Sequence, residues 1–445
     1  MAGSLNTRVI RILEEIESLG LHVSYKEREN KIVSVGIIGV IGEEEVEVEE
    51  EELKPKIRDL LRELAKSEAV EFLYLHGLPL REIPEEIGGL TELRILTLHS
   101  LLVKTLPESI GNLVNLEELT ITDSGLRTLP ESFGNLVNLK YLEIECTSLE
   151  RLPESFGNLV NLEKLHLVDN ELRSLPESFG NLKKLRFLDL SYNRLNTLPE
   201  SFGGLISLEE LHICNNGLMR LPESIGSLKN LRKLDLEGGR LRSLPESIGN
   251  LERLEVLWAY RNELVSIPES IGRLKRLRVL YLFDNDLTSI PESIGDLTNL
   301  EDLSVSYNNL TSLPESIGNL TNLRYLSAEG NYLTSLPDSF RRLKNLEELY
   351  LYDNRFERVP ECICDLVNLR HLDLHENMLT TLPECFSRLR NLENLDLRDN
   401  KISEFPEVLF SLPRLKKLYL KGNPICRDES KVKEIEEALK CKGWC

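Results

Sequence analysis

Several kinds of residue that would point to particular protein classes are scarce in this sequence. It has 8 cysteines among 445 residues, too few for a disulfide-rich secreted scaffold. No run approaches the roughly 18 consecutive apolar residues that a membrane-spanning helix needs. Glu14 and Glu15 lie where a signal peptide would be apolar. We therefore expect a cytoplasmic protein whose cysteines are mostly thiols.

Positive charge is also in short supply. The chain has 54 Lys and Arg against 74 Asp and Glu, which gives a formal net charge of −20. An acidic surface of this size repels nucleic-acid phosphates and anionic lipid head groups. We therefore expect neither a nucleic-acid nor a membrane partner, and a protein with a basic patch suits the charge better.

Catalytic and cofactor-binding motifs are missing. The sequence has no Gly-Lys dipeptide for a phosphate-binding loop, no HExxH, no GxSxG and no paired CxxC. Gly36, Gly39 and Gly42 are spaced GxxGxxG, which is not the dinucleotide-binding fingerprint. We expect no enzymatic activity, no catalytic residues, no cofactor and no metal site.

What the sequence does have is a strict internal repeat. From Pro84 to Pro406 a proline recurs every 23 residues without insertion or deletion, and the same unit surrounds each one, as in LPESIGNLTNLRYLSAEGNYLTS from Leu313 to Ser335. A period of this length indicates a solenoid of stacked coils. This unit resembles the leucine-rich repeat, LxxLxLxxNxLxxLPxxIGxL. Aligned on the first leucine, sixteen repeats run from Val70 to the one that begins at Leu415.

The pattern within each repeat predicts its local structure. In LxxLxL the apolar side chains alternate with variable ones, as in a strand with one buried face. We expect Leu323, Leu326 and Ala328 to point inward while Tyr325 and Ser327 face solvent. The segment PESIGNL that follows predicts a short helical or 3₁₀ turn on the convex side, with Ser as its cap. The strands should form a parallel sheet that lines the concave face of a curved horseshoe, so the fold class is α/β.

An asparagine follows the strand in eleven of the repeats, for example Asn285 and Asn308. Its amide can satisfy backbone groups of the neighbouring coils, so this column predicts a hydrogen-bonded spine. The first four repeats have Leu78, Leu101, Ser124 and Thr147 at this position. We expect an irregular or specially capped turn there. In the last repeats the glycine of IGNL is replaced, for example by Arg341, so positive φ is not obligatory at that position.

The two ends of the array differ from the repeats. We assign residues 1–69 to an α+β cap, 70–424 to the sixteen repeats and 425–445 to a helical C-terminal cap, because exposed terminal coils need polar covers. Helical spacing predicts one helix between Thr7 and Gly20, a second from about Leu53 to Ala65, and a third over 431–440. The segment KIVSVGIIGVI, residues 31–41, has apolar residues in leucine-repeat spacing and is interpreted as a degenerate edge strand or a pseudo-repeat. The glutamate-rich segment 43–52 is a solvated arm or an acidic docking segment.

Three arrangements of histidine or cysteine were weighed as sites. His76 and His99 occupy equivalent positions on adjacent strands, but no third metal ligand is evident. His212 and Cys214 face the same way without an orienting acid. Cys362 and Cys385 align in adjacent repeats and should stack on the convex side with Cys364 nearby, where they replace small residues, pair or bind metal. Pairing among Cys426, Cys441 and Cys445 stays open.

The concave face carries a candidate binding surface. Aromatic residues gather at the third, fifth and seventh positions of LxxLxLx in the ninth to thirteenth repeats, with acidic residues among them. Aromatic side chains are over-represented among the energetic anchors of interfaces. The candidate protein-binding residues are Trp258, Tyr260, Tyr281, Phe283, Asp284, Tyr307, Tyr325, Glu329, Tyr350, Tyr352 and Asp353. Cross-strand stacking that only stabilises the sheet is the alternative reading.

The 23-residue unit is most similar to the intracellular Ras-group type of leucine-rich repeat protein. This resemblance implies a non-catalytic, monomeric scaffold that binds a signalling protein, such as a small GTPase, through its concave face. The alternative is a substrate-recognition subunit of an effector or ubiquitin-ligase assembly whose catalytic module is on another chain. The repeat consensus specifies the coil and not the ligand, so it names no partner.

Overall fold

A computed structural model describes residues 2–41, 44–45 and 48–427. The chain divides into two compact parts, an N-terminal part from Met1 to Leu218 and a C-terminal part from Met219 to Cys445. Each part is described by itself. The expected C-terminal helix over 431–440, Cys441 and Cys445 lie outside the described residues, as does part of the glutamate-rich segment.

The N-terminal part begins with helices and a hairpin. The elements are α1 (Ala2–Glu17), β1 (His22–Arg28), β2 (Lys31–Ile38), β3 (Val40–Ile41), β4 (Glu44–Glu45) and α2 (Glu50–Ala65). β2 pairs in parallel with β5, as a further repeat would, and β1 pairs antiparallel on its other side. Of the two alternatives for this segment, β2 therefore pairs as a pseudo-repeat would and is not an edge strand. β2 is covered by β1, whose polar side chains are largely exposed and so suit an edge.

Repeated strands and 3₁₀ helices follow in the N-terminal part. The strands are β5 (Phe72–His76), β6 (Ile95–His99), β7 (Glu118–Thr122), β8 (Tyr141–Glu145), β9 (Lys164–His166), β10 (Phe187–Asp189) and β11 (Glu210–His212). Between them lie η1 (Glu85–Gly89), η2 (Glu108–Asn112), η3 (Glu131–Asn135), η4 (Glu154–Asn158), η5 (Glu177–Asn181) and η6 (Glu200–Gly204).

The C-terminal part continues the same alternation. Its strands are β12 (Lys233–Asp235), β13 (Val256–Trp258), β14 (Val279–Tyr281), β15 (Asp302–Ser304), β16 (Tyr325–Ser327), β17 (Glu348–Tyr350), β18 (His371–Asp373), β19 (Asn394–Asp396) and β20 (Lys417–Tyr419). The 3₁₀ helices are η7 (Glu223–Ser227), η8 (Glu246–Asn250), η9 (Glu269–Arg273), η10 (Glu292–Asp296), η11 (Glu315–Asn319), η12 (Asp338–Arg342), η13 (Glu361–Asp365), η14 (Glu384–Arg388), η15 (Glu407–Ser411) and η16 (Pro424–Arg427).

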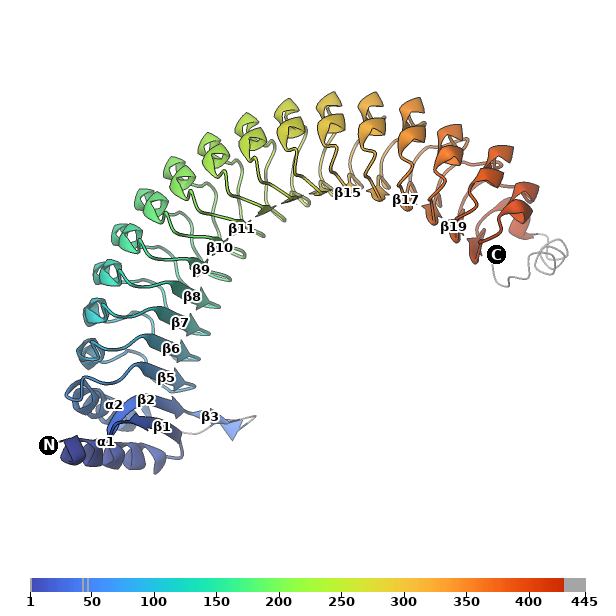
Figure 1. Ribbon diagram of the computed structural model, residues 1–445. Helices are drawn as coiled ribbons and strands as arrows, with labels where there is room; N and C mark the ends of the chain where they lie inside the picture. Colours follow the sequence, from blue (N-terminus) through green and yellow to red (C-terminus); the bar gives the residue numbers. More distant parts are fainter. Residues whose placement is uncertain (1, 42–43, 46–47, 428–445) are drawn as a thin grey trace. The chain divides into compact units, whose positions relative to one another are not determined.

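Successive strands in each part pair in parallel and in register, one repeat apart, as Leu280 opposite Leu303 shows. Within each part, the strands lie along one side of the coils and the 3₁₀ helices along the other (Figure 1). This arrangement confirms the predicted leucine-rich repeat solenoid. The turn in PESIGNL is a 3₁₀ helix and not a longer α-helix.

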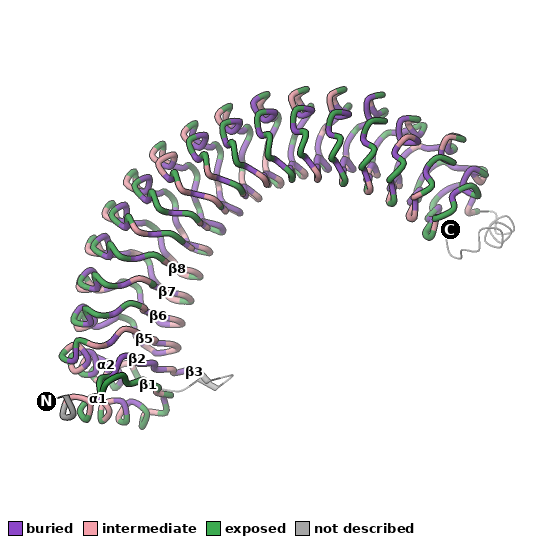
Figure 2. The backbone as a smooth tube through the Cα atoms, viewed as in Figure 1, coloured by how far each residue is buried: buried purple, intermediate pink, exposed green. Residues whose placement is uncertain are grey.

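The core is a stack of aliphatic side chains one coil thick. Leu323, Leu326 and Ala328 are fully buried, as the alternating pattern predicted. Buried and exposed stretches alternate along every coil (Figure 2). Each buried Leu contributes roughly 1.5–3 kcal/mol, and because its neighbours come mainly from adjacent repeats, stability depends on stacking.

The predicted asparagine spine is present. Asn308 Nδ2 donates to the carbonyl oxygens of Leu282, Val305 and Ser306, and its Oδ1 accepts from the backbone N–H of Leu287 at 2.9 Å. This one side chain therefore satisfies backbone groups of two adjacent repeats. The same set of bonds recurs at Asn331 and at most of the other asparagines of the column.

The first four repeats, which lack this asparagine, form longer strands. β5 to β8 have five residues each, whereas β9 to β20 have three. In later repeats the backbone bonds at the equivalent positions persist, for example from the N–H of Ala328 to the carbonyl of Tyr350, and the asparagine side chain adds further bonds beside them. Every repeat has a residue with positive φ just before the asparagine position, for example Ser100 and Asp123 here. The irregular turn expected at Leu78 and Leu101 is thus a change in strand length.

On the convex side, the serine and the glycine of PESIG have roles that differ from those expected. The serine of PESIG does not cap its 3₁₀ helix, since the N-cap is the preceding proline and makes no side-chain bond. Instead Ser132 Oγ donates to the carbonyl of Glu108 in the previous repeat, at 2.6 Å. The glycine beside it has negative φ, but a Cβ at Gly111 would lie 2.4 Å from the carbonyl oxygen of Ser132. Close approach of the coils, and not backbone conformation, therefore selects glycine there.

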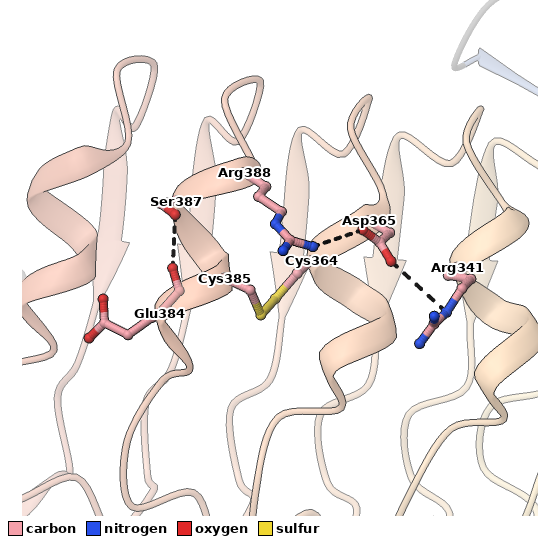
Figure 3. Close-up of a disulfide and its surroundings, with 7 residues drawn as sticks. All are labelled: Arg341, Cys364, Asp365, Glu384, Cys385, Ser387 and Arg388. Atoms are coloured by element: carbon pink, nitrogen blue, oxygen red, sulfur yellow. Dashed lines mark hydrogen bonds and ion pairs between the residues drawn. A yellow bond between two sulfur atoms is a disulfide. The ribbon is translucent and has the colours of Figure 1, made fainter.

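The cysteines on this side include a disulfide, which is one of the alternatives that the sequence left open. Cys364 forms this disulfide with Cys385 (Figure 3). Cys362 is buried and free. Cys364 occupies the glycine position of its repeat, and that position faces the serine position of the next repeat, which Cys385 occupies. Cys362 and Cys385 are aligned in the sequence but are not partners. Asp365 lies beside this disulfide and forms ion pairs with two arginines. Its Oδ1 lies 3.2 Å from Arg388 Nη1, and its Oδ2 lies 4.0 Å from Arg341 Nε.

A ladder of alternating charge runs along each part. The residue after the first leucine of each repeat is by turns acidic and basic from Glu71 to Lys416, without exception. In the C-terminal part, Arg278 Nη2 lies 2.9 Å from Glu301 Oε2, and Arg324 pairs with Glu347. A second asparagine column lies nearby, where for example Asn345 Nδ2 donates to the carbonyl of Thr321. Neither the charge ladder nor the second asparagine column was predicted from the sequence.

Candidate protein-binding surface

The candidate aromatic residues lie together on the concave face of the C-terminal part. Trp258 lies directly opposite Tyr281 across β13 and β14, and Tyr325 opposite Glu348 across β16 and β17. All seven aromatic members of the fifth, seventh and third columns are half-buried: Trp258, Tyr260, Tyr281, Phe283, Tyr325, Tyr350 and Tyr352. Each of these side chains is therefore partly accessible to solvent. We call this set, with Asp284, Tyr307, Glu329 and Asp353, the concave patch.

The rings stack on one another across the strands. Tyr260 and Phe283 are nearly parallel with centroids 4.2 Å apart, and Tyr352 stacks on His375 at the same separation. Tyr325 and Tyr350 have centroids 5.5 Å apart. Such pairs stabilise neighbouring repeats by about 0.5–1.5 kcal/mol each beyond their burial. Stacking and partner contact are compatible here, because the stacked residues are still partly exposed.

Small side chains lie between the rings of β13 and β14, which include Trp258 and Tyr281, and the rings of β16 and β17, which include Tyr325 and Tyr350. Ser304, Ser306 and Ser327 are all at most 5% exposed and share hydroxyl hydrogen bonds. Ser327 Oγ donates to Glu329 Oε2 at 2.5 Å, and Glu329 itself is only 8% exposed. Burial raises the pKa of the Glu329 carboxyl, against the lowering effect of these hydrogen bonds. Glu329 therefore differs from the other members of the patch, because it belongs to a buried polar network.

Three members of the concave patch lie in the turn that follows the strand. Asp284, Tyr307 and Asp353 are exposed and have φ between 49° and 57°. Tyr307 reaches over Gly330, where a Cβ would lie 2.5 Å from its ring, and its hydroxyl lies 2.9 Å from that of Tyr352. A glycine at 330 thus permits a tyrosine bridge between repeats that are two apart.

The electrostatic environment of the concave patch is acidic. Burial raises the pKa of Tyr281, with a further contribution from the charge of Asp302. Burial and a hydrogen bond to Glu348 raise the pKa of the Tyr350 phenol. Burial also raises the pKa of Asp302, and its neighbours Glu301 and Glu348 act in the same direction. The phenols are therefore neutral donors in the physiological range, next to carboxylates.

The imidazoles of His76 and His99 form contacts with each other and with neighbouring hydroxyl groups. The rings of His76 and His99 meet edge to face with centroids 4.4 Å apart. His76 Nδ1 lies 2.7 Å from the Tyr74 hydroxyl, and His99 Nδ1 bonds the Thr122 hydroxyl. Burial lowers the pKa of His76, and the nearby His99 lowers it further. These contacts leave the two imidazoles in a hydrogen-bonded aromatic cluster.

A second aromatic row, in the N-terminal part, was not predicted. Tyr141, His166, Phe187 and His212 stack diagonally from β8 to β11, with centroids 4.7 to 5.6 Å apart. The rings alternate between the third and fifth columns, so no single column of the alignment shows them. Burial lowers the pKa of His166. Reading diagonally across the repeats would have found this row.

Two clusters among the described residues contain possible metal ligands. In the first, Asp235 lies beside His212 and Cys214, an acid that the sequence did not reveal. The second is formed by two aspartates and a histidine. Asp373, His375 and Asp396 place ligand atoms within 4.8 Å of one another. Asp396 is already bound by Arg398, whose Nη2 lies 2.6 Å from Oδ2, and Asp373 Oδ1 lies 2.7 Å from His375 Nδ1. Both aspartates also accept a bond from the backbone N–H two residues on. These bonds account for the buried carboxylates without an ion.

A cavity of about 830 Å³ lies between α1, α2 and η1 in the N-terminal part. Its charged lining is balanced, because Arg62 pairs with Glu86 and Lys66 with Glu63. This balance selects neither an anionic nor a cationic ligand. The concave patch is therefore the stronger candidate site.

Comparison with known proteins identifies the family. The family model described as a leucine-rich repeat region matches residues 127–217, 211–285 and 267–359, and two further leucine-rich repeat models match 344–386 and 380–425. No curated protein sequence is significantly similar to the chain. No helix among the described residues is long and apolar enough to cross a bilayer.

Several solved structures are similar. A leucine-rich repeat protein of Leptospira interrogans is 34% identical, with a TM-score of 0.69 over 85% of this chain and 91% of that one. The plant peptide hormone receptor RGFR1, solved in complex with RGF2, is 29% identical, with a TM-score of 0.61 over 81% and 68%. YopM from Yersinia enterocolitica is 27% identical, with a TM-score of 0.59 over 80% and 70%. The fold is typical of protein-binding scaffolds, and this chain belongs to the leucine-rich repeat family.

Proposed function

We propose that the protein is a non-catalytic scaffold that binds a protein partner with a basic patch through the concave patch. One observation carries this proposal. In the five repeats that begin at Leu254 to Leu346, no lysine or arginine occupies any of the three concave columns, which hold seven aromatic and three acidic residues. A surface of this composition favours a partner that supplies cations and apolar contact.

The size and shape of the surface support the proposal. Five adjacent strands at about 4.8 Å spacing span roughly 20 Å, which is the scale of a protein contact. The rings are held by stacking, so little side-chain entropy is lost when a partner binds. The complex of the similar plant receptor with RGF2 is a precedent within the fold.

Capture from the native lysate tests the proposal. Changing Tyr281, Phe283 and Tyr350 together to Ser should abolish partner capture without changing the far-ultraviolet spectrum. The matched control changes three exposed convex-side valines, Val114, Val137 and Val160, to Ser. Undiminished capture by the concave variant, or equal loss by both variants, would contradict the assignment.

The proposal also covers the type of partner, the oligomeric state and the cellular compartment. The resemblance of the repeat to the Ras-group type favours a signalling partner such as a small GTPase, and a monomeric, cytoplasmic protein. The Cys364–Cys385 disulfide requires local oxidation in that compartment. Alkylation of thiols in intact cells before lysis tests this setting: a fully oxidised pair in all molecules would contradict a reducing location.

We also propose that residues 1–69 act as an N-terminal cap. β1 covers the edge of β2, and α2 buries Leu53, Ile57 and Leu61. Removing this segment should lower the melting temperature, because it would expose the apolar face of the first repeats. A truncated protein that melts at the same temperature would show that the segment is an independent module.

A further inference from the structure

The third column of the concave face contains an acidic–aromatic–acidic row, of which Tyr325 belongs to the concave patch. Asp302, Tyr325 and Glu348 lie directly opposite one another on β15, β16 and β17. Adjacent strands are about 4.8 Å apart, so the backbones of the two acidic residues are separated by about 10 Å with the phenol ring between them. The row faces solvent, since Asp302 and Tyr325 are half-buried and Glu348 is exposed.

Asp302 is an acid without a direct partner in the part of the chain that the structure describes. Among the described residues, no donor forms a hydrogen bond or ion pair with its carboxylate, although Arg278 and Arg324 act on it at longer range. Glu348 accepts one hydrogen bond, from the Tyr350 hydroxyl at 2.9 Å. Each carboxylate therefore has lone pairs left for a donor that comes from outside the chain.

The aromatic ring between them offers a surface for a cation. Elsewhere in the C-terminal part the chain uses such surfaces itself: Lys233 Nζ lies 4.2 Å from the centroid of Trp258, and the guanidinium of Arg355 lies 4.3 Å from that of Tyr332. No Lys or Arg of the concave columns is available to cover Tyr325 in this way.

From this geometry we propose that Asp302, Tyr325 and Glu348 form a recognition site for an arginine side chain of the partner. The guanidinium stacks on the ring of Tyr325 and donates its hydrogen bonds to the carboxylates on either side. Arginine fits better than lysine because its planar fork can stack and donate to two acceptors at once, whereas an ammonium is a compact, strongly hydrated charge. This inference rests on the proposed function, since it names what the concave patch recognises.

Short peptides test the site without knowledge of the natural partner. The probes are three otherwise identical uncharged glycine-rich peptides that carry one arginine, one lysine or one citrulline, titrated to about 10 mM because a single side chain binds weakly. Binding is followed by ligand-observed nuclear magnetic resonance. We expect the arginine peptide to bind several-fold more tightly than the lysine peptide and the citrulline peptide to bind least.

Isosteric variants locate the site. Asp302→Asn and Glu348→Gln should each weaken binding of the arginine peptide by about tenfold, the effect of losing one charge-assisted hydrogen bond, and should remove the preference over lysine. Asp286→Asn, which neutralises an exposed acid outside the concave columns, should leave binding unchanged. Thermal melts of each variant confirm folding.

Two results would overturn the inference: no preference for arginine in the unchanged protein, or equal binding by Asp302→Asn, Glu348→Gln and Asp286→Asn. Both are distinguishable from failure of the proposed function. If the arginine site is wrong but the concave patch binds protein, partner capture is still lost in the triple Tyr281, Phe283 and Tyr350 variant. If the proposed function is wrong, that variant captures the partner normally.

Discussion

The guanidinium of Arg278 donates two hydrogen bonds to the carboxylate of Glu301, each 2.9 Å long. Neither residue is isolated, because Glu255 precedes this pair in the same column and Arg324 follows it. Each charge therefore has an opposite charge on both sides. If a repeat stacked on the next but one instead of on its direct neighbour, like charges would lie together. The charge ladder therefore favours the observed order of stacking.

The ladder predicts that exchange of one pair is costly. Exchanging the residues, Arg278→Glu with Glu301→Arg, keeps their pairing but places like charges beside Glu255 and Arg324. We expect a loss of about 1 kcal/mol in the free energy of unfolding, reduced by high salt because the charges are exposed. Chemical denaturation at low and high salt measures it. The control exchanges Arg194 and Glu171, a pair with uncharged neighbours in its column, and a loss as large there would contradict the ladder.

The asparagine spine predicts a large local effect. Asn308→Ala removes four hydrogen bonds and leaves the N–H of Leu287 without an acceptor, so we expect a loss of about 2–4 kcal/mol. Asn345→Ala removes one exposed bond, to the carbonyl of Thr321, and should cost less than about 1 kcal/mol. Urea unfolding of the two variants compares them, and similar losses would show that the inner column has no special role.

The disulfide predicts a dependence on reductant. Reducing the bond between Cys364 and Cys385, which are 21 residues apart, should remove about 3 kcal/mol of stability through the chain entropy of the unfolded state. The double variant Cys364→Gly with Cys385→Ser restores the usual residues of the repeat, and its melting temperature should depend less on reductant than that of the unchanged protein. Cys362→Ser, which leaves the disulfide intact, should keep the full dependence. A double variant that responds to reductant as strongly as the unchanged protein would contradict this assignment.

The half-buried imidazole of His166 predicts a pH dependence. Burial holds its pKa below the ordinary value of 6.5, so the unfolded chain binds the proton more tightly. This imidazole therefore lowers stability progressively as pH falls through 6.5 towards its folded pKa, and the full loss is reached below that pKa. Burial and nearby acids raise the pKa of Glu145, which acts in the opposite direction at lower pH.

A comparison of His166→Gln with the unchanged protein isolates this contribution. Melting temperatures measured between about pH 7.5 and pH 5.5 should fall less for the variant, because glutamine does not titrate. Parallel curves for the two proteins would show that His166 does not contribute.

The features predictable from the sequence were those that repeat within one coil. The leucine positions, the 3₁₀ turn and the asparagine spine each follow from a local pattern that recurs every 23 residues. Contacts on the convex side do not follow that spacing. Cys364 meets Cys385 after 21 residues, and Ser132 meets Glu108 after 24. Aligned columns placed Cys362 beside Cys385 instead. The offset comes from close packing of the coils, which a one-dimensional alignment does not contain.

The candidate site was predictable in part for a similar reason. Column positions placed Tyr281, Phe283 and Tyr350 on the concave face, where they lie. They could not show that Glu329 is buried in a serine network or that Tyr307 crosses Gly330 to reach Tyr352. Both depend on the size of neighbouring side chains, which sets how far a residue leans over the next strand.

Hydroxyl-radical footprinting of the complex with its captured partner tests the central claim most directly, because it reports the solvent exposure of individual side chains. The account predicts that Tyr281, Phe283 and Tyr350 become protected, while the exposed convex-side Val114, Val137 and Val160 react as in the free protein. Protection of the convex side with an unchanged concave patch would contradict it.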